Sequence, residues 1–358
     1  MSNPVSAFWY DSTMSGAPTL SGEAGKLIGV LDACLKDGFG SVTLDSVVVT
    51  DGVATATKSA GHGFTDYVVV TIAGATPSGL NGNKRLTRTS STVFTFDATG
   101  ISNQTATGTI TAKMAAVGWT KSYSGTNKAA YARSDAQATA MLLRVDDSPT
   151  QYPTLIMYES MSDVDTGAGA STTRYFAKSN AANSTARAWR LFADSRAFYL
   201  FTDADGSTWP SAMFFGDIKH YRSGDMYHCL LIGHAAANTT SHLHFVDGTT
   251  TGAELMRSWT QVGMVVASGR YSHRGCQYLG VGPLQTPNWA DNALHVWPVQ
   301  VCDGTTVARG EMPGLFCPIH NSLMPNGSII NQGSYRLLNQ MTYSASYRAA
   351  LNITGPWR

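Results

Sequence analysis

Five histidines crowd into one part of the chain and are the side chains best suited to binding a metal ion. They are His220, His228, His234, His242 and His244. His242 and His244 are two residues apart, so on a strand both would point to one face and could clamp one ion. A third ligand is not evident, because no carboxylate follows His244 at a suitable distance and Cys229 has no CxxC partner. The pattern therefore favours surface or turn histidines over a metal site.

Carboxylate clusters suggest a second kind of chemistry, because glycoside hydrolysis uses a pair of Asp or Glu side chains. The candidates are Glu159, Asp163 and Asp165, then Asp203 and Asp205, and finally Asp217. The stretch from Asp203 to Ser207 is, however, typical of a polar turn, and Asp163 to Gly169 is typical of a solvated loop. The Asp-x-Asp-Gly string at Asp203 also lacks the further acidic ligands of a calcium-binding EF-hand loop.

No sequence motif of a catalytic or cofactor-binding type accompanies these clusters. The chain lacks a Gly-x-Ser-x-Gly elbow, a phosphate-binding glycine-rich loop and a His-Glu-x-x-His helix. We therefore predict no catalytic residue, no metal ligand and no cofactor, and we expect the protein not to be an enzyme.

Tryptophans offer a different kind of site, namely a binding surface. Most of the eight tryptophans should lie in a core, since each covers a large apolar area. Trp209-Pro210 and Trp289 stand beside turn residues and could instead line a sugar-binding surface or a protein contact. We favour the protein contact, because aromatic anchors with few charges are typical of interface cores.

The composition limits the classes of partner. Only 14% of the residues are charged and the formal net charge is +1, so no basic face is expected for nucleic acid. No stretch approaches the roughly 20 apolar residues that cross a bilayer, and Met1 to Ser21 lacks the features of a signal peptide. We therefore expect a protein made in the cytoplasm and soluble there. The five cysteines are spaced irregularly, which predicts reduced, buried thiols rather than disulfides. They are Cys34, Cys229, Cys276, Cys302 and Cys317.

The stretch from Ser41 to Lys113 is predicted to form a small all-β module. Asp51-Gly52 suits the positive φ angles of a two-residue type I′ hairpin, and Asn81-Gly82 repeats the signal. The β-type runs are 47–50, 53–57, 67–72, 84–89, 93–96 and 107–112. A module of this size is able to bury its own core, so we expect that its removal would cost the rest of the chain little.

The residues before the module contain one predicted helix and an aromatic arm. Apolar residues recur every three or four positions after Ser21, which would be the N-cap, and Asp37-Gly38 would end the helix. Phe8-Trp9-Tyr10 near one end of the chain and Pro356-Trp357 near the other are costly to leave in water. We expect a neighbouring subunit to order at least one of these ends.

The rest of the chain continues as short β-type runs, 10 to 15 residues apart, as is typical of a sandwich or barrel. The predicted fold is therefore mainly β, with a β-sandwich or barrel-like main domain, one short N-terminal helix and an inserted small all-β module. Residues 1–40 would supply an arm and helix belonging to the main domain, 41–113 the module, and 114–358 the rest of the main domain.

Four stretches spread along the chain carry a family resemblance. They are Leu20 to Ser41 around the helix, Phe215-Gly216-Asp217-Ile218, Gly310 to Leu315, and Ile353 to Arg358. Together they resemble a family of tailed-bacteriophage and prophage virion proteins. The module separately resembles a small domain of phage tail proteins, through Gly61-His62-Gly63-Phe64, Val70 to Ala75, Leu80-Asn81-Gly82 and Phe94-Thr95-Phe96.

That small domain is often described as similar to the first-catalytic-cysteine half-domain of ubiquitin-activating enzymes. Ser41 to Lys113 contains no cysteine, so the likeness concerns shape and implies no ubiquitin chemistry.

The resemblance implies a structural component of the virion, in the tail tip, the baseplate or the fibre-attachment region. Its partners would be other virion proteins and copies of itself in a symmetric oligomer, which packs through flat β surfaces of low charge. The expected location is the virion, after assembly in the host cytoplasm. Two alternatives stay open: a tail protein that recognises a host glycan, and a decoration protein of the capsid.

Overall fold

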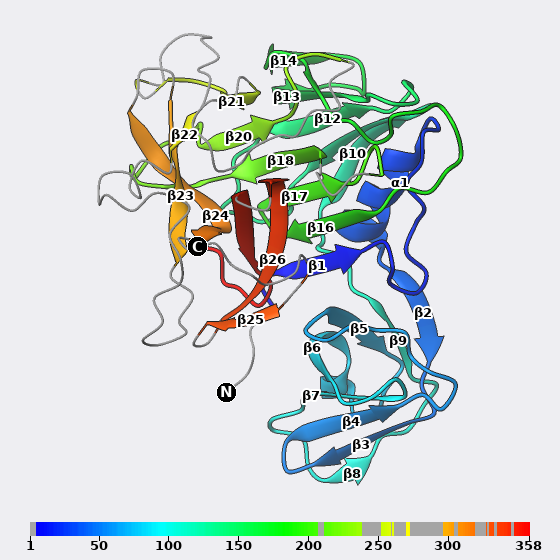
Figure 1. The fold of residues 1–358 in the computed structure, drawn as a ribbon. Helices are drawn as coiled ribbons and strands as arrows, with labels where there is room; N and C mark the ends of the chain where they lie inside the picture. Colours follow the sequence, from blue (N-terminus) through cyan, green and yellow to red (C-terminus); the bar gives the residue numbers. More distant parts are fainter. Residues whose placement is uncertain are drawn as a thin grey trace.

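The computed structural model describes residues 5–206, 211–237, 252–258, 260, 270–272, 296–303, 307–318, 327, 329–332, 335–344 and 347–358. Strands dominate this part of the chain and form four sheets, three in a layered body and one in the module that Figure 1 shows below it. The predicted mainly β fold, with a sandwich- or barrel-like body and one short helix, is confirmed.

The most deeply buried sheet lies at the centre of the body. Neighbouring strands in it are antiparallel. Every residue of its strands β17 and β18 is buried, which explains why their sequences are almost continuously apolar instead of alternating. In spatial order the strands are β1 (Phe8–Asp11), β16 (Trp189–Ala193), β17 (Ala197–Thr202), β18 (Ser211–Asp217), β20 (Cys229–Ile232) and β21 (Ala253–Leu255).

Both faces of the central sheet are covered, as the alternation of side chains along β17 shows. Phe198 and Phe215 are directly paired, and the Trp119 ring packs edge-on against them at centroid distances of 5.5 and 6.0 Å. Tyr199, the next residue of β17, points to the opposite face, where its ring lies 5.6 Å from the Trp357 ring. The central sheet is thus the middle layer of the body.

The two outer layers come from the segments on either side of it in the sequence. One contains β10 (Thr120–Gly125), β11 (Lys128–Ala132), β12 (Leu142–Asp146), β13 (Thr154–Met161) and β14 (Gly167–Ala170), with β15 (Arg174–Tyr175) beside β13. The other contains β22 (Arg270–Ser272), β23 (Val296–Cys302), β24 (Ala308–Pro318), β27 (Tyr347–Asn352), β26 (Tyr335–Ser344) and β25 (Ile329–Gln332). The short β19 (Lys219–His220) leaves the central sheet and pairs with β24, joining the two layers.

The predicted helix is present and is shorter than expected. Helix α1 (Lys26–Leu31) continues as a π-helical segment (Asp32–Asp37), and Gly38 ends it at a φ of 72°, as predicted. None of the helices in the described part of the chain is long and apolar enough to span a bilayer.

Helix α1 is not capped by Ser21, the predicted N-cap. The Ser21 hydroxyl donates to Glu23 (2.8 Å), and Gly25, in the left-handed region at a φ of 80°, precedes the helix. Asp147 Oδ2 instead accepts the backbone N–H of Leu27 at 2.7 Å. The prediction was wrong because a carboxylate from a distant strand end, and not a local side chain, satisfies the first turn.

Both aromatic ends of the chain pack within the chain itself. Phe8, Trp9 and Tyr10 are 6%, 4% and 1% exposed, because β1 forms the edge of the central sheet beside β16. The Tyr10 hydroxyl donates to the Ala115 carbonyl (2.7 Å). Trp357 is 6% exposed at the other end. The expectation that a neighbouring subunit orders one end is therefore wrong, since these side chains find their pockets in their own chain.

The module is an eight-stranded sheet made of residues 39–114. The predicted β runs correspond to β3, β4, β5, β6, β7 and β9, while the independence of the module as a domain stays a prediction. Its strands, in spatial order, are β2 (Phe39–Thr43), β9 (Thr111–Met114), β5 (Val69–Ala73), β6 (Gly82–Arg88), β7 (Val93–Asp97), β4 (Val53–Thr57), β3 (Ser46–Thr50) and β8 (Gln104–Thr105).

One of the two predicted hairpin turns is confirmed. Asp51 and Gly52 have φ angles of 51° and 76°, and Thr50 pairs with Val53 as a type I′ turn requires. Asn81 instead has a φ of −76° and follows a 3₁₀ turn (Ser78–Leu80), so the second prediction was wrong. The Asn81 side chain bonds both the N–H and the carbonyl of one alanine (2.9 and 2.8 Å), which fixes this longer connection.

The thiols in the described residues fit the reduced state that was predicted. Cys34 and Cys229 are free and buried, and Cys302 is partly buried. Cys276 and the Cys317 side chain lie outside what the structure describes.

Candidate functional site

Two of the five predicted histidines meet in the structure. His220 on β19 and His228 just before β20 stack with ring centroids 4.2 Å apart and planes at 28°. His234 lies elsewhere and hydrogen-bonds a serine at the start of β18 (2.8 Å). His242 and His244, the favoured metal pair, lie outside the described residues. Among the residues that are described, no three His, Cys, Asp or Glu side chains are grouped to hold a metal ion.

Asp217, at the end of β18, is the buried carboxylate beside this histidine pair. It accepts the N–H and the hydroxyl of Thr139 (3.0 and 2.8 Å) and lies 3.2 Å from Arg133 Nη1. His228 Nε2 lies 3.7 Å away. Burial pushes the pKa of Asp217 upward, but hydrogen bonding from His228 and the charge of Arg133 hold that pKa well below its ordinary value. Asp217 is therefore an ionised structural carboxylate and a poor general acid.

The thiol next to this carboxylate is equally unsuited to nucleophilic chemistry. Arg133 Nη1 donates to Cys229 Sγ at 3.1 Å. Burial nevertheless raises the pKa of Cys229 to about 11, an effect that the nearby guanidinium only partly offsets. Because the thiolate is the reactive form, Cys229 is inert at neutral pH.

The predicted cluster of Glu159, Asp163 and Asp165 does not form an acid–base pair. Glu159 is held by Arg257 through two bonds of 2.8 and 2.9 Å. Asp165 accepts a bond from Arg144 (2.7 Å), and Asp163 accepts the backbone N–H of Asp165 (2.8 Å). Each carboxylate therefore neutralises a cation or shapes its own loop, which is the alternative that the sequence favoured.

Asp203 and Asp205 follow β17, where a polar turn was predicted. The Asp203 N–H donates to the Ala188 carbonyl at 2.8 Å, which extends the pairing of β16 and β17 by one step. Asp205 is exposed. Trp209-Pro210 and Trp289, the predicted contact residues, lie outside the described residues.

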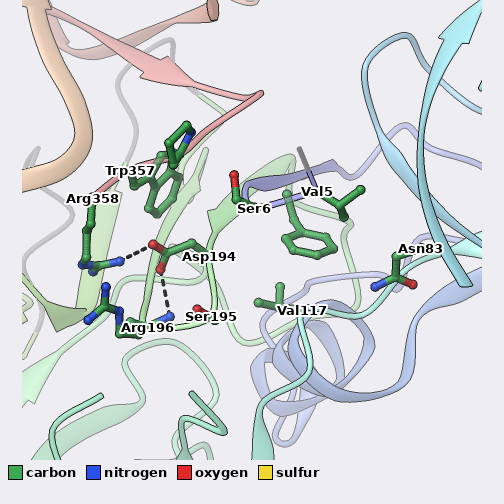
Figure 2. Close-up of a pocket in the computed structure, with 11 residues that line it drawn as sticks. Val5, Ser6, Asn83, Val117, Asp194, Ser195, Arg196, Trp357 and Arg358 are labelled. Atoms are coloured by element: carbon green, nitrogen blue, oxygen red, sulfur yellow. Dashed lines mark hydrogen bonds and ion pairs between the residues drawn. The ribbon is translucent and has the colours of Figure 1, made fainter. Parts of the chain in front are cut away.

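A cleft that no sequence pattern indicated lies where both ends of the chain approach the module (Figure 2). Its volume is about 350 Å³. Figure 2 shows Arg358 directed at Asp194, with which it forms an ion pair, and Asp194 also accepts the Arg196 N–H (2.8 Å). Val5, Ser6, Asn83, Val117 and Trp357 complete much of the wall. A second cleft of about 410 Å³ shares Trp357 and Arg358 with the first.

The charges around the first cleft balance one another. Burial raises the pKa of Asp194 and the Arg358 guanidinium opposes this, so the two groups depend on each other. The Ser195 hydroxyl donates to Asp135 (2.5 Å), and Arg196 Nε lies 3.7 Å from the same carboxylate. No serine–histidine or cysteine–histidine pair lies among the residues that line this cleft, so it lacks an activated nucleophile.

Arg85, on β6 of the module, bonds to residues near both ends of the chain. It is 6% exposed, and its guanidinium donates to the carbonyls of Tyr67 (2.8 Å), Ile353 (2.8 Å) and Ala7 (2.7 Å). A longer bond of 3.4 Å reaches Thr354. Burial lowers the pKa of Arg85 to about 10, so the group stays charged at neutral pH and relies on these carbonyl oxygens.

These bonds change the expectation for excision of the module. Removing residues 41–113 would take Arg85 away from the buried carbonyls of Ala7 and Ile353. We therefore expect excision to cost more than the small entropy of closing a loop.

Metal removal tests the part of the histidine cluster that the structure does not describe. We expect the unfolding temperature to be the same with and without a chelator, because a metal that bound only the folded state would stabilise it by mass action. Differential scanning fluorimetry with excess EDTA makes the measurement. A drop of several degrees, reversed by added zinc and absent from a His242→Ala variant, would identify a site at His242 and His244.

Comparison with known proteins assigns no function to this geometry. No family model matches the chain, and a search of the curated proteins finds no match. The likeness to tailed-phage virion proteins therefore stays a hypothesis that rests on the stretches named above.

Proposed function

We propose that the protein is a structural component of a tailed-phage virion, in the tail tip, the baseplate or the fibre-attachment region. It acts by assembling with copies of itself and with other virion proteins. The resemblance of the four sequence stretches suggests the virion, and the internal chemistry of the fold supports a structural role over a catalytic one.

The observation that carries this proposal is that three of the six candidate carboxylates are each paired with an arginine. Glu159 is bound by Arg257, Asp165 by Arg144 and Asp217 by Arg133. A general acid needs a carboxyl group that faces its substrate, whereas these three carboxylates are held by arginines. Carboxylates that are paired with arginines stabilise the fold, which favours a structural role over a catalytic one.

The buried ends and the Arg85 bonds support the same role. A virion component has to present fixed surfaces to several neighbours, and rigid-body packing is the default in a closed symmetric assembly. Here the arm is a strand of the central sheet, and Arg85 ties both ends of the chain to the module.

Immunogold labelling of purified particles tests the proposal. An antibody raised against this chain should label intact particles at the tail, at a constant position, and should leave particles from a strain lacking the gene unlabelled. Label over the head would favour the capsid-decoration alternative. If the chain stayed in the particle-free supernatant at every stage of purification, the virion assignment would be wrong.

The glycan-binding alternative has no support from the described residues. Trp209-Pro210 and Trp289, on which it depended, lie outside them. It stays a prediction, which binding to a glycan array would test.

A further inference from the structure

A lysine and an aspartate are buried together at the start of helix α1. The Lys178 amine forms an ion pair with Asp147, and the side chains of both residues are 0% exposed. Asp147 directly follows β12, and Lys178 follows β15. Lysines that pair with carboxylates elsewhere in the body keep contact with water, since the side chain of Lys121 is 19% exposed and that of Lys128 is 29% exposed. The pair of Lys178 and Asp147 therefore has an environment that those pairs lack.

Backbone hydrogen bonds fix both residues in place. The Asp147 N–H donates to the Asn127 carbonyl (2.7 Å), and the Asp147 carbonyl accepts the Gly25 N–H (3.0 Å). The Lys178 N–H donates to the Gln151 carbonyl at 3.0 Å. Because both backbones are held, the amine and the carboxyl group stay in contact, as two reactants would at a very high concentration.

The two oxygens of the Asp147 carboxyl group have different partners. Oδ2 accepts the backbone N–H groups of Leu27 (2.7 Å) and Ile28 (3.3 Å), whereas Oδ1 accepts the Lys178 amine. The amine also donates to the Glu23 backbone carbonyl at 2.6 Å. Two N–H groups directed at one oxygen stabilise negative charge that develops on it, as they do in the oxyanion holes of acyl-transfer enzymes. The other oxygen, Oδ1, is then the one that can leave.

Burial favours the neutral forms of both groups. It raises the pKa of Asp147 and lowers the pKa of Lys178, although the charge of each group opposes the shift of the other. A proton that moves from Nζ to Oδ1 leaves an amine and a carboxylic acid in contact and shielded from water. These are the two reactants of amide formation, because a neutral amine is a nucleophile and a protonated oxygen leaves as water.

We propose that Lys178 and Asp147 condense to form an intramolecular amide bond, so that the buried ion pair is the precursor of a covalent crosslink. Nζ attacks Cγ of Asp147, and the bond between Cγ and Oδ1 breaks. Of the three protons of the charged amine, one stays on the amide nitrogen and two leave with Oδ1 as water. The negative charge of the tetrahedral intermediate lies on Oδ2, which the N–H groups of Leu27 and Ile28 face. The reaction needs neither an oxidant nor a cofactor.

Two buried arginine pairs of the body show why the lysine matters. Arg133 with Asp217, and Arg309 with Asp225, have side chains that are at most 1% exposed. A guanidinium does not lose its proton in proteins, so it is a poor nucleophile and these pairs stay ionic. The simpler alternative for Lys178 and Asp147 is likewise a permanent ion pair. The two alternatives differ in the mass of the chain, because only the amide bond releases a water molecule.

The crosslink would connect three parts of the body that are separate in the sequence. It closes a loop that contains β13, β14 and β15, since Lys178 lies 31 residues after Asp147. Oδ2 of the amide still accepts the Leu27 N–H, so the crosslink also holds the start of α1. A crosslink of this kind stabilises the fold by restricting the unfolded chain. This inference goes beyond the assembly function proposed above and does not depend on it.

Mass spectrometry of the intact, denatured chain tests the proposal. The wild-type chain, after incubation at neutral pH, should weigh less than its sequence by the mass of one water molecule. Lys178→Arg keeps a cation beside Asp147 but forms no amide, so it should have the full mass of its sequence. Lys128→Arg, at the exposed pair with Asp165, is the matched control and should still show the loss of water.

Peptide mapping of the wild-type chain locates the bond, and it decides the question even if Lys178→Arg fails to fold. Trypsin does not cut after an acylated lysine, so peptide 145–174 should be found joined to peptide 175–187, with Lys178 uncut. Closure of a succinimide at Asp51-Gly52 would also release water, but that loss would persist in Lys178→Arg. A wild-type chain that keeps its full mass, a loss of water that is unchanged in Lys178→Arg, or normal cleavage after Lys178 would each overturn the proposal.

Discussion

Replacing Arg85 by alanine is expected to lower the free energy of unfolding by about 4 kcal/mol, since each buried polar group left without a partner costs about 1 to 3 kcal/mol. The carbonyls of Ala7, Tyr67 and Ile353 would all lose their donor. Urea unfolding followed by tryptophan fluorescence and circular dichroism measures the change. Limited proteolysis should also cut the Arg85→Ala variant sooner near residues 7 and 353.

Arg88 provides the matched control for this prediction. It lies on the same strand, three residues further on, and is exposed, so Arg88→Ala should change the free energy of unfolding by less than about 0.5 kcal/mol. Arg85→Lys keeps the charge and loses the planar fork that reaches several carbonyls at once, so it should fall between the two. Equal stability of the Arg85→Ala and Arg88→Ala variants would contradict the role assigned to Arg85.

Replacing Asp217 by asparagine is expected to lower the free energy of unfolding by about 3 to 5 kcal/mol, because it leaves a buried guanidinium without its counter-charge. The Arg133 and Asp217 side chains are both 0% exposed, and their closest atoms lie 3.2 Å apart. Asparagine keeps the size of the side chain, so the loss comes from charge and not from a cavity. Asp51→Asn is the control, since Asp51 is exposed and asparagine suits its type I′ turn equally well.

The same carboxylate predicts how stability depends on pH. The pKa of Asp217 is lower in the folded chain than its ordinary value of 3.8. Its contribution is therefore complete above that value and is lost as the pH falls toward the folded pKa. Unfolding free energies measured from pH 6 to pH 2 should fall less steeply in Asp217→Asn than in the wild type. Identical slopes would mean that Asp217 is not held ionised by its neighbours.

The sequence predicts those parts of the fold whose causes are local. The apolar runs of β16, β17 and β18 and the Asp51-Gly52 turn were found because burial and positive φ act on neighbouring residues. The start of α1 was missed because its cap, Asp147, lies 120 residues further on. Phe8 to Tyr10 were correctly expected to need a pocket, but the sequence alone does not show whose pocket it is.

The candidate site was less predictable than the fold, because its residues are brought together from distant parts of the chain. Residue types identified a histidine cluster, and the fold brings only His220 and His228 of its described members together. The cleft beside Asp194 is built from five distant segments, so no window of sequence contains it. Arg85 gave no signal either, because a lone arginine in a β run is ordinarily a solvated residue.

The position of Arg85 in the chain has a consequence for the timing of synthesis. Its partners Ala7 and Ile353 lie 78 residues before it and 268 residues after it. At about 5 to 20 residues per second, the ribosome needs about 13 to 54 s to add those 268 residues. For that interval Arg85 lacks the Ile353 carbonyl, one of the carbonyls outside the module to which it donates. A nascent chain of this protein therefore completes the bonds of Arg85 only after the strand β27 has emerged from the ribosome.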